Sequence, residues 1–538
     1  MTVTIPGILL GMKKNLESMV FSNSFVEELP GDPNLVNSVR NVSKACYSLV
    51  QPEPVGSPKL IAYSEELFAM LGIGVAEKTG IAVDILSGNL VLGSMKPYAA
   101  RYGGHQFGHW AGQLGDGRAI TLGEILNPEG SRFEIQLKGA GETPYSRRGD
   151  GRAVFRSSLR EFLCSEAMAY LGIPTTRALS LVSTGDMVMR DMFYDGNAEL
   201  EPGAVVCRVA PSFLRFGSFE ILADSSENDI LEKLLQYLIR HHFPEYGTGK
   251  EAYARWFYEI CKRTALLMVD WQRVGFVHGV MNTDNMSALG LTLDYGPYGW
   301  LEVFDPSWTP NTTDFSTHRY AYGKQPEIAY WNLTCLASSL LPILDKKYIE
   351  EGLSIYAPTF NQAYHEAFFH KLGFLEHNGA EDEILLGELM SLLVAVETDF
   401  TLFFRLLIDL PFHEELTTED LISGFLPAYY DESYKQESYK RQFGSWIRKY
   451  RQKTQKQGLD SLKRRELMQR VNPSFVLRNY LVQEAIDMAS NGDYSRIAEL
   501  MDGLKNPYAD LPEHKQFTKR RPEWARHKPG CSALSCSS

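Results

Sequence analysis

Apolar and polar residues follow two different periods along this chain, and the change of period divides it. From Gly103 to Arg215, short strand-like runs lie between glycine-rich turns. From about Asp229 onward, apolar residues recur at helical spacing, with one strand-like interruption between Phe276 and Asp294. The pattern therefore predicts a β-rich region followed by a helical region.

Two strands and a helix are the clearest elements of the β-rich region. Residues 118–125 (RAITLGEI) and 132–139 (RFEIQLKG) are predicted strands, joined by the turn LNPEG. In the second strand three apolar side chains alternate with three polar ones: Phe133, Ile135 and Leu137 against Glu134, Gln136 and Lys138. A helix is predicted over residues 152–171, before the stop signal of Gly172 and Pro174. Its apolar face comprises Phe155, Leu159, Phe162 and Leu163.

The length of 538 residues exceeds what one hydrophobic core usually supports, so several parts are expected. Short helical patterns and loops in residues 1–90 form an N-terminal extension. The β-rich region occupies residues 91–222, and the main helical region occupies residues 223–460. Residues 461–538 form a C-terminal extension. It has further helices over 465–503 and a tail rich in Lys, Arg and Pro that we expect to be loosely held.

Composition and charge narrow the class of protein. The chain is 44% apolar and 22% charged, which is ordinary for a soluble globular enzyme. Its formal charge of -12 argues against a general nucleic-acid binder, because contacts to phosphates need clustered Lys and Arg. No apolar run reaches the length of a membrane span, and the apolar patch Ile5–Leu10 precedes Lys13 and Lys14, the reverse of a signal peptide. We expect a cytoplasmic protein with enough core to be a monomer.

Seven cysteines are present, and none form a CxxC pair, which argues against a zinc ribbon. Their odd number and their scatter indicate reduced thiols. Cys531 and Cys536 differ from the others because they lie in the small, polar tail sequence CSALSCSS. We expect both to be exposed and able to react, with two inert tail cysteines as the alternative.

The most informative segment is HGVMNTDNMSALGLTLDYG, residues 278–296. If MSAL and LTLD form a hairpin around a Leu-Gly turn, Ala288 faces Leu291 and Asn285 faces Asp294. Directly opposed residues have Cβ atoms about 4.5–5.5 Å apart. An amide oxygen and a carboxylate at that separation can share a hard cation such as Mg²⁺. An exposed polar pair flanking a turn is the alternative.

The same segment follows the order of protein kinases, whose H-R-D-x-x-x-x-N and D-F-G motifs hold metal ions through Asn and Asp. Aligning His278 on the kinase His places Asn285 on the kinase Asn, and Asp294 begins a DYG in place of DFG. The catalytic Asp of kinases then falls on Val280, which cannot accept a proton. Asp284 lies next to Asn285 and is the obvious replacement for the missing base.

Glycine and basic residues upstream supply the other half of a nucleotide site. The turn GDGR at 115–118 lies two strands ahead of Lys138, and Glu161 in the next helix is placed to pair with that lysine, as in kinases. Backbone N–H groups of a glycine turn approach phosphates closely, and basic side chains add charge. The candidate contacts are Gly115, Gly117, Arg118, Lys138, Asp150, Gly151, Glu161, Arg208 and Arg215.

Each of these features has a plainer interpretation when it is taken singly. Most Gly-Asp-Gly triplets are simple turns, a lysine that ends a strand is usually a solvated edge residue, and paired arginines often form surface salt bridges. The order of the glycine turn, Lys138, Glu161 and the metal segment favours the nucleotide site over these alternatives.

Long motifs then identify a family. The sequences GHQFGHWAGQLGDGRA, QLKGAGETPYSRRGDGRAVFRSSLREF, VHGVMNTDNMS and DYGPYG, with the closing CSS, closely resemble the selenoprotein O family of protein adenylyltransferases, from about residue 30 to the C-terminus. The resemblance implies an α+β, bilobal, protein-kinase-like (pseudokinase) fold. It would have a β-rich, nucleotide-binding N-lobe, a helical C-lobe with the catalytic and metal loop, and N- and C-terminal extensions.

The resemblance also implies an activity. ATP would bind in a flipped orientation, and AMP would pass to Ser, Thr or Tyr hydroxyls of proteins, including those of the enzyme itself, with release of pyrophosphate. Asp284 would be the proton acceptor, and Asn285 and Asp294 would hold Mg²⁺ or Mn²⁺. UMP transfer with Mn²⁺ is a related expectation. The nucleotide contacts it implies are Gly115, Gly117, Arg118, Lys138, Asp150, Gly151, Arg208 and Arg215.

The sequence departs from the family pattern at two points, and two other functions remain as alternatives. Eukaryotic members of the family carry selenocysteine third from the end, where this chain has Cys536. Some bacterial members lock the activation segment to the tail by a disulfide, but no cysteine lies here between Asp294 and Trp331, which leaves a pair of Cys536 with Cys335 or Cys531 open. The alternative functions are phosphoryl transfer by a kinase-like enzyme and a non-catalytic nucleotide-binding scaffold.

Overall fold

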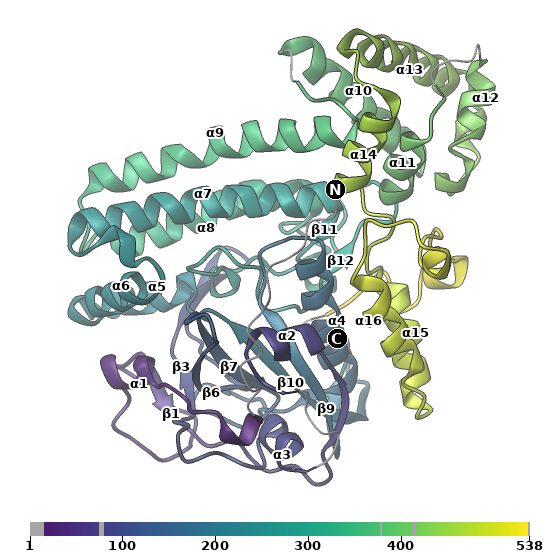
Figure 1. Cartoon of the computed structure of the whole chain (residues 1–538). Helices are drawn as coiled ribbons and strands as arrows, with labels where there is room; N and C mark the ends of the chain where they lie inside the picture. Colours follow the sequence, from purple (N-terminus) through teal and green to yellow (C-terminus); the bar gives the residue numbers. More distant parts are fainter. Residues whose placement is uncertain (1–14, 75–79, 377–378, 412–415, 536–538) are drawn as a thin grey trace.

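The chain folds into a β-rich half and a helical half, which lie one below the other in Figure 1. The structure is a computed structural model, and it describes residues 15–74, 80–376, 379–411 and 416–535. A mixed sheet-and-helix architecture is therefore confirmed. Among the described residues no helix combines the length and the apolar character that crossing a membrane requires.

The β-rich half is built on one antiparallel sheet with the strand order β1-β3-β6-β7-β10-β9-β2, and β8 pairs with β10. The predicted strands are confirmed as β6 and β7, within one residue at each end. The strands of the sheet are β1 (Tyr47–Leu49), β2 (Lys59–Tyr63), β3 (Tyr98–Ala100), β6 (Ala119–Leu126), β7 (Arg132–Lys138), β8 (Ala153–Val154), β9 (Arg177–Asp191) and β10 (Ala198–Ala210).

The alternation along β7 and β10 decides which side chains lie on each face of the sheet. Ile135 and Leu137 lie in one apolar core together with Cys207 of β10. Because successive residues of a strand point to opposite faces, Lys138 and Arg208 share the other face. The ladder pairs Val206 with Lys138 and Arg208 with Gln136, so the polar residues of both strands form one row.

Helices cover both faces of the sheet. α4 (Phe155–Tyr170) packs against β9 and β10 on the face of the polar row, and α2 (Glu65–Met70) and α3 (Ile81–Ser87) contribute to the core on the other face. The predicted helix over 152–171 is confirmed, although it begins three residues late because β8 pairs with β10 before it. α1 (Ser24–Glu28) lies beside β1 in Figure 1.

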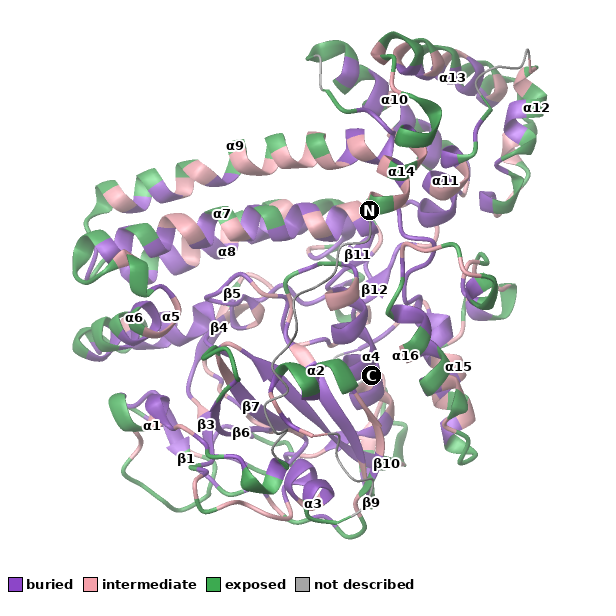
Figure 2. Ribbon diagram, in the orientation of Figure 1, coloured by how far each residue is buried: buried purple, intermediate pink, exposed green. Residues whose placement is uncertain are grey.

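The helical half begins earlier than the sequence pattern indicated, at α5, because Phe216 and Phe219 are buried in the main core. α7, α8 and α9 pack side by side above the sheet, whereas α10 to α14 surround a second core (Figures 1 and 2). These helices are α5 (Phe216–Asp224), α6 (Asn228–His242), α7 (Lys250–Val274), α8 (Gln325–Leu340), α9 (Lys346–Lys371), α10 (Ala380–Ala395), α11 (Phe400–Ile408), α12 (Thr418–Ser423), α13 (Glu437–Gln457) and α14 (Ser461–Val471).

The C-terminal helices predicted over 465–503 are confirmed, but the loosely held tail is not. Helices α14, α15 (Asn479–Ser490) and α16 (Ser495–Leu504) precede a tail that is hydrogen-bonded to the body of the protein. Arg160 of α4 donates to the carbonyl of Gly530 at 3.3 Å, and Asn479 donates to the carbonyl of Cys531 at 2.9 Å.

Cys531 is therefore buried rather than exposed, and both it and Cys335 are free thiols. Cys536 lies outside the described residues.

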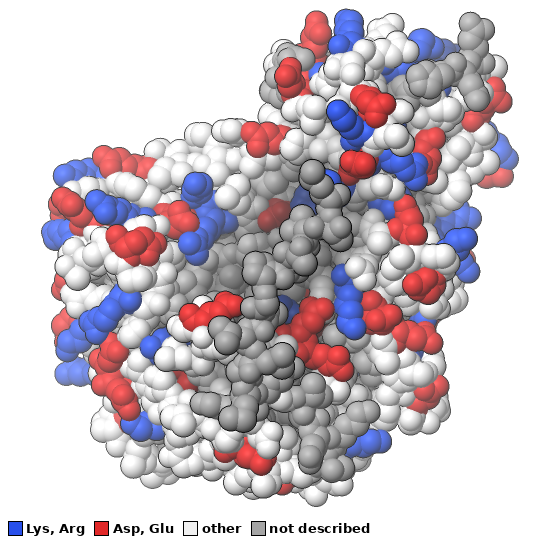
Figure 3. Space-filling model, viewed as in Figure 1, with Lys and Arg blue, Asp and Glu red and all other residues white. Residues whose placement is uncertain are grey.

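Two small antiparallel ladders lie outside this sheet. β4 (Gly103–Gln106) and β5 (His109–Gln113) form a hairpin next to α5, and β11 (Phe276–Val277) pairs with β12 (Gly299–Trp300). On the face of the molecule in Figure 3, Lys and Arg are interspersed with Asp and Glu.

Candidate functional site: a charged cluster and a separate buried aspartate

Strands β7 and β10 and helix α4 bring three predicted residues into contact. The ammonium group of Lys138 lies 2.7 Å from a carboxylate oxygen of Glu161, and the other oxygen of Glu161 accepts from Arg208 at 3.0 Å. All three side chains are largely buried. The pairing of Lys138 with Glu161 that the sequence predicts is thus present. It follows from the register, which places Lys138 on the face that α4 covers.

Asp294 joins this cluster from the helical half. Its carboxylate accepts hydrogen bonds from Arg208 and Arg215 and lies 3.6 Å from the ammonium group of Lys138. Burial alone would raise the pKa of Asp294, but Arg215, Arg208 and Lys138 outweigh it and hold the pKa well below its usual range. Asp294 is consequently ionised at any physiological pH.

Arg215 links the cluster to the segment that carries Asp284. Its guanidinium donates to the backbone carbonyl of Asp284 at 2.7 Å and lies 4.5 Å from the ring centroid of Tyr102. Arg215 is the N-cap residue of α5, so the start of that helix fixes its backbone. The guanidinium therefore holds Asp294 and the neighbouring segment in one arrangement.

Asp284 has the opposite environment, although it belongs to the same segment. One carboxylate oxygen accepts from the side chain of Gln106 at 3.2 Å, whereas the other, Oδ1, is buried without a hydrogen-bond partner among the described residues. Burial raises the pKa of Asp284 to about 7, against the opposing effect of Arg215. A carboxylate with that pKa is suited to take up a proton near neutral pH.

The β4–β5 hairpin covers Asp284 closely. A Cβ atom on Gly104 would stand 2.5 Å from Oδ1 of Asp284, so only glycine fits there. The backbone N–H of His105 donates to the hydroxyl of Thr283 at 2.7 Å, and that of Phe107 donates to the hydroxyl of Tyr320 at 2.9 Å. The hairpin thus lies directly against Asp284. The sequence patterns did not predict this contact, although the hairpin lies within the family motif GHQFGHWAGQLGDGRA.

The residues aligned with the kinase catalytic loop have distinct positions. His278 is buried and its Nε2 lies 2.9 Å from the carbonyl oxygen of Leu293. Val280, at the kinase base position, is buried and presents no proton acceptor. Asn285 ends the short 3-10 turn Thr283–Asn285, and its amide nitrogen donates to the carbonyl of Val280 at 2.9 Å.

The predicted hairpin register is wrong. Met286 pairs with Thr292, so the ladder is one residue out of the expected register and Asn285 does not face Asp294 in it. The cause is competition from outside the segment. Ser287 pairs with Arg215, and the carbonyl of Thr292 accepts from the backbone N–H of Thr176 at 2.9 Å. These contacts hold the segment in a register that differs from the one the isolated sequence favoured.

The turn Gly115–Arg118 lies directly beside the strand end that carries Lys138. Ala119 pairs with Lys138 in the ladder, and the N–H of Gly139 donates to the carbonyl of Arg118 at 2.7 Å. Gly115 has a φ of +109°, and a Cβ there would stand 2.4 Å from the ring of Tyr145. Glycine is required at this position by packing as well as by backbone conformation.

Asp150 and Gly151 lie near the residues that follow Lys138: the backbone N–H of Gly141 donates to the carbonyl of Gly151 at 3.1 Å. Gly139 and Asp150 line a cavity of about 360 Å³. The Asp150 carboxylate is paired with Arg190 at 2.6 Å, and this pairing lowers the pKa of Asp150 although burial opposes it. The structure therefore places Asp150 in an ion pair with Arg190, outside the cluster around Asp294.

Two polar residues of the cluster were missed in the sequence. Gln136 accepts from Arg208 and donates to a carboxylate oxygen of Asp116 at 3.3 Å. Asp116 is the central acid of the GDGR turn, and it lies 3.8 Å from Arg215. Both are buried. The alternation along residues 132–139 already placed Gln136 beside Lys138, so that pattern could have identified it.

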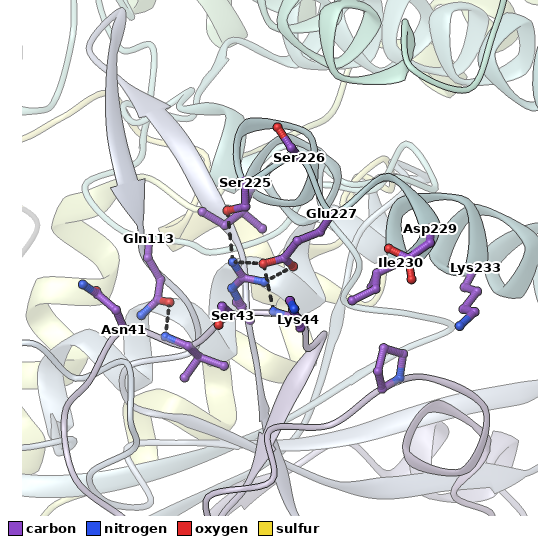
Figure 4. Close-up of a pocket in the computed structure, with 14 residues that line it drawn as sticks. Asn41, Ser43, Lys44, Gln113, Ser225, Ser226, Glu227, Asp229, Ile230 and Lys233 are labelled. Carbon is purple, nitrogen blue, oxygen red and sulfur yellow. Dashed lines mark hydrogen bonds and ion pairs between the residues drawn. The ribbon is translucent and has the colours of Figure 1, made fainter.

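A separate cavity of about 850 Å³ lies between the N-terminal extension and the start of α6 (Figure 4). Two of its polar groups share one carboxylate: Arg101 donates to Glu227 at 2.7 Å, and the backbone N–H of Lys44 donates to the same carboxylate at 2.8 Å. The predicted site residues, all of which lie in the described part of the chain, do not line it.

The described site brings convergent basic side chains together with a buried carboxyl group, that of Asp284, whose pKa is raised. Residues 33–505 match the family model described as protein adenylyltransferase SelO. Similar proteins named protein nucleotidyltransferase YdiU occur in Nitrosospira multiformis (53% identical, covering 96% of each chain) and Methylobacillus flagellatus (54% identical, covering 97% of this chain and 100% of the relative). Another is found in Rhodopirellula baltica (48% identical, covering 97% and 99%).

The chain therefore belongs to the SelO family of protein adenylyltransferases. It is an enzyme of the nucleotidyltransferase class.

Proposed function

We propose that this enzyme transfers AMP from ATP to Ser, Thr or Tyr hydroxyls of proteins. The acceptor oxygen attacks the α-phosphorus, the bond from the α-phosphorus to the bridging oxygen breaks, and pyrophosphate leaves. The hydroxyl proton passes to Asp284. The observation that carries this proposal is the buried Oδ1 of Asp284, which has no partner in the described structure, next to cations suited to a polyphosphate.

The environments of Asp284 and Asp294 support different roles for the two acids. Environments that push the pKa values of neighbouring acids apart are a mark of acid–base assignments in active sites. The pKa of Asp294 is held well below its usual range by basic groups, whereas burial raises that of Asp284 to about 7. Asp294 thus serves as a permanent charge and Asp284 as the proton acceptor.

Lys138, Arg208 and Arg215 are the proposed phosphate contacts. Guanidinium groups bind phosphate oxygens in a bidentate manner, and an ammonium group adds a point charge. In the described structure their donors engage Glu161 and Asp294. Nucleotide binding in this proposal exchanges part of these contacts for contacts with the phosphates, with ATP flipped so that the α-phosphorus faces Asp284. Arg118 and the glycines at 115, 117 and 151 are proposed to line the same nucleotide, with Asp150 near its far end.

Mg²⁺ or Mn²⁺ is the proposed metal, and the residues present fit it. Asp294 supplies a carboxylate that stays ionised, and the amide nitrogen of Asn285 is held by the carbonyl of Val280, which leaves its oxygen as the ligand. Oxygen donors of this kind suit hard divalent cations. When bound, the metal neutralises charge on the phosphates. Asn285 and Asp294 would hold it, while Asp284 handles the proton.

Labelled nucleotides test the reaction class. With the enzyme and a protein acceptor, label should pass to protein from α-labelled ATP and not from γ-labelled ATP. Transfer from the γ position alone would show a kinase, and no transfer from either would show a nucleotide-binding scaffold. Omitting the acceptor measures self-modification, and replacing ATP with labelled UTP in the presence of Mn²⁺ measures UMP transfer.

A further inference from the structure

A second group of metal-ligating side chains lies behind the catalytic segment. It consists of His105 on β4, Glu220 on α5 and Cys335 on α8, and one ligand atom from each lies within 4.8 Å of the others. Nδ1 of His105 is 3.0 Å from a carboxylate oxygen of Glu220. Three separate elements contribute, and α5 packs against both β4 and α8, so the fold itself brings the side chains together.

The donor atoms differ in kind from those proposed for the nucleotide metal. A thiolate, an imidazole and a carboxylate are the ligands that Zn²⁺ accepts, whereas Mg²⁺ prefers oxygen alone. With the Cys335 thiol deprotonated, the set carries two negative charges, which a divalent cation neutralises. Ligand atoms around tetrahedral Zn²⁺ are roughly 3.3–3.8 Å apart, given bonds of about 2.0–2.3 Å, so the longest separation in the group needs to close by at most about 1.5 Å.

The surroundings of the group also fit a metal. Glu220 is buried, and its second oxygen accepts from the hydroxyl of Thr283, which orients the carboxylate as an outer-shell partner does. The side chain of His105 is 28% exposed, which leaves a path for an ion and a position for a fourth ligand from water. The rings of Trp110 and Trp331 lie 5.1 and 5.5 Å from the His105 ring and limit its rotation.

We propose that His105, Glu220 and Cys335 bind a Zn²⁺ ion that fastens the β4–β5 hairpin to α5 and α8. The site is independent of the metal that accompanies ATP. Through Thr283, which accepts from the N–H of His105 and donates to Glu220, it borders Asp284. The ion acts as a positioning element, because the same hairpin presents Gly104 and Gln106 to Asp284.

Metal analysis of the full-length protein tests this proposal. After dialysis against excess Mg²⁺, we expect about one Zn²⁺ per chain by mass spectrometry of the metal, since three protein ligands are sufficient for a zinc site with one water. Protein reloaded with Co²⁺ should show a thiolate-to-cobalt charge-transfer band. Cys335→Ser and His105→Ala should each lose the band and weaken Co²⁺ binding by at least about 100-fold, because loss of an inner ligand exceeds the effect of outer-shell changes.

Matched variants separate this result from general damage. His109→Ala removes an exposed histidine of the same hairpin, and Cys531→Ser removes a thiol outside the group. Both should keep the zinc and the band. Added Zn²⁺ should raise the Tm of the wild-type protein and of these controls, but not that of Cys335→Ser. Cys335→Ala replaces the serine variant in this test if the serine variant folds poorly. A wild-type protein that keeps no zinc and gives no cobalt band, or a Cys335→Ser protein that binds Co²⁺ as the wild type does, would overturn the proposal.

Discussion

Two buried charge clusters in this protein are built from the same residue types but are arranged differently. Around Asp294, one carboxylate contacts three basic side chains, while Asp284 on the same segment has an oxygen without a partner in the described structure. In the C-terminal half, Asp399 pairs with Arg478 at 2.8 Å, and Glu302 pairs with Arg521 at 2.7 Å.

The second cluster is also closed by neutral donors. The carboxylate of Asp399 accepts from the hydroxyl of Tyr430 at 2.8 Å and from the N–H of Leu402 at 3.0 Å, where it caps α11. Charges paired one to one, with neutral donors around the carboxylate of Asp399, fix the packing of helices. Charges distributed unevenly can instead bind phosphates at one end and accept a proton at the other. Under the proposed function, the first cluster has a chemical role and the second a structural one.

The largest effect is expected from Asp294→Ala, which should reduce AMP transfer to the background of the assay. The variant removes the only charged ligand in the proposed metal site. Asn285→Ala should be milder and partly restored by excess Mn²⁺, measured as initial rates at several metal concentrations. Equal losses in both variants that Mn²⁺ does not restore, with metal binding intact, would contradict the assignment of these two residues.

Asp284→Asn should lower turnover by about 10²–10⁴-fold, the usual contribution of a general base, with ATP affinity nearly unchanged. The change keeps the shape of the side chain and removes its basicity. Single-turnover rates and nucleotide titrations provide the two readouts. Val280→Asp places a carboxylate at the kinase base position as a matched test, and it should not produce γ-phosphate transfer. A fully active Asp284→Asn enzyme would show that another group takes the proton.

Asp399→Asn should act on stability rather than on chemistry. Breaking one partner of a buried pair costs about 3–5 kcal/mol, because the remaining charge is left uncompensated. We expect that loss in the free energy of unfolding from urea titration, with the rate per folded molecule preserved. Glu350→Gln is the control. Glu350 pairs with Lys346, both side chains are exposed, and exposed ion pairs contribute about 0–1 kcal/mol to stability. If the two variants were equally stable, Asp399 would not be structural.

The smallest effect concerns pH. The pKa of Asp284 is raised to about 7 by burial, so the fraction of the active, deprotonated form falls as pH falls below that value. The kcat/KM should therefore decrease about tenfold per pH unit between pH 7 and 5 and level off above the pKa. The residual activity of Asp284→Asn should lack this inflection. A wild-type profile that is flat over the same range would mean that Asp284 is already ionised or is not the base.

Sequence patterns predicted the local elements well where the pattern is strong. The alternation of residues 132–139 identified β7 and the face that carries Lys138, and the helical spacing identified α4 with Glu161. The order of these residues was enough to predict their ion pair, which the structure has at 2.7 Å. Local spacing was insufficient to predict the pairing of the segment 286–294, because Ser287 pairs with Arg215 and Thr292 pairs with Thr175, both far away in sequence.

The sequence by itself determined the family, the positions of the candidate residues and the absence of a proton acceptor at Val280, because these depend on residue identity and order. The tertiary structure alone decided how the two aspartates differ. Asp294 is surrounded by Lys138, Arg208 and Arg215, and Asp284 is buried under Gly104 with little compensation. The reason is physical: the pKa of a carboxyl group depends on burial and on nearby charges, and elements distant in the chain supply both.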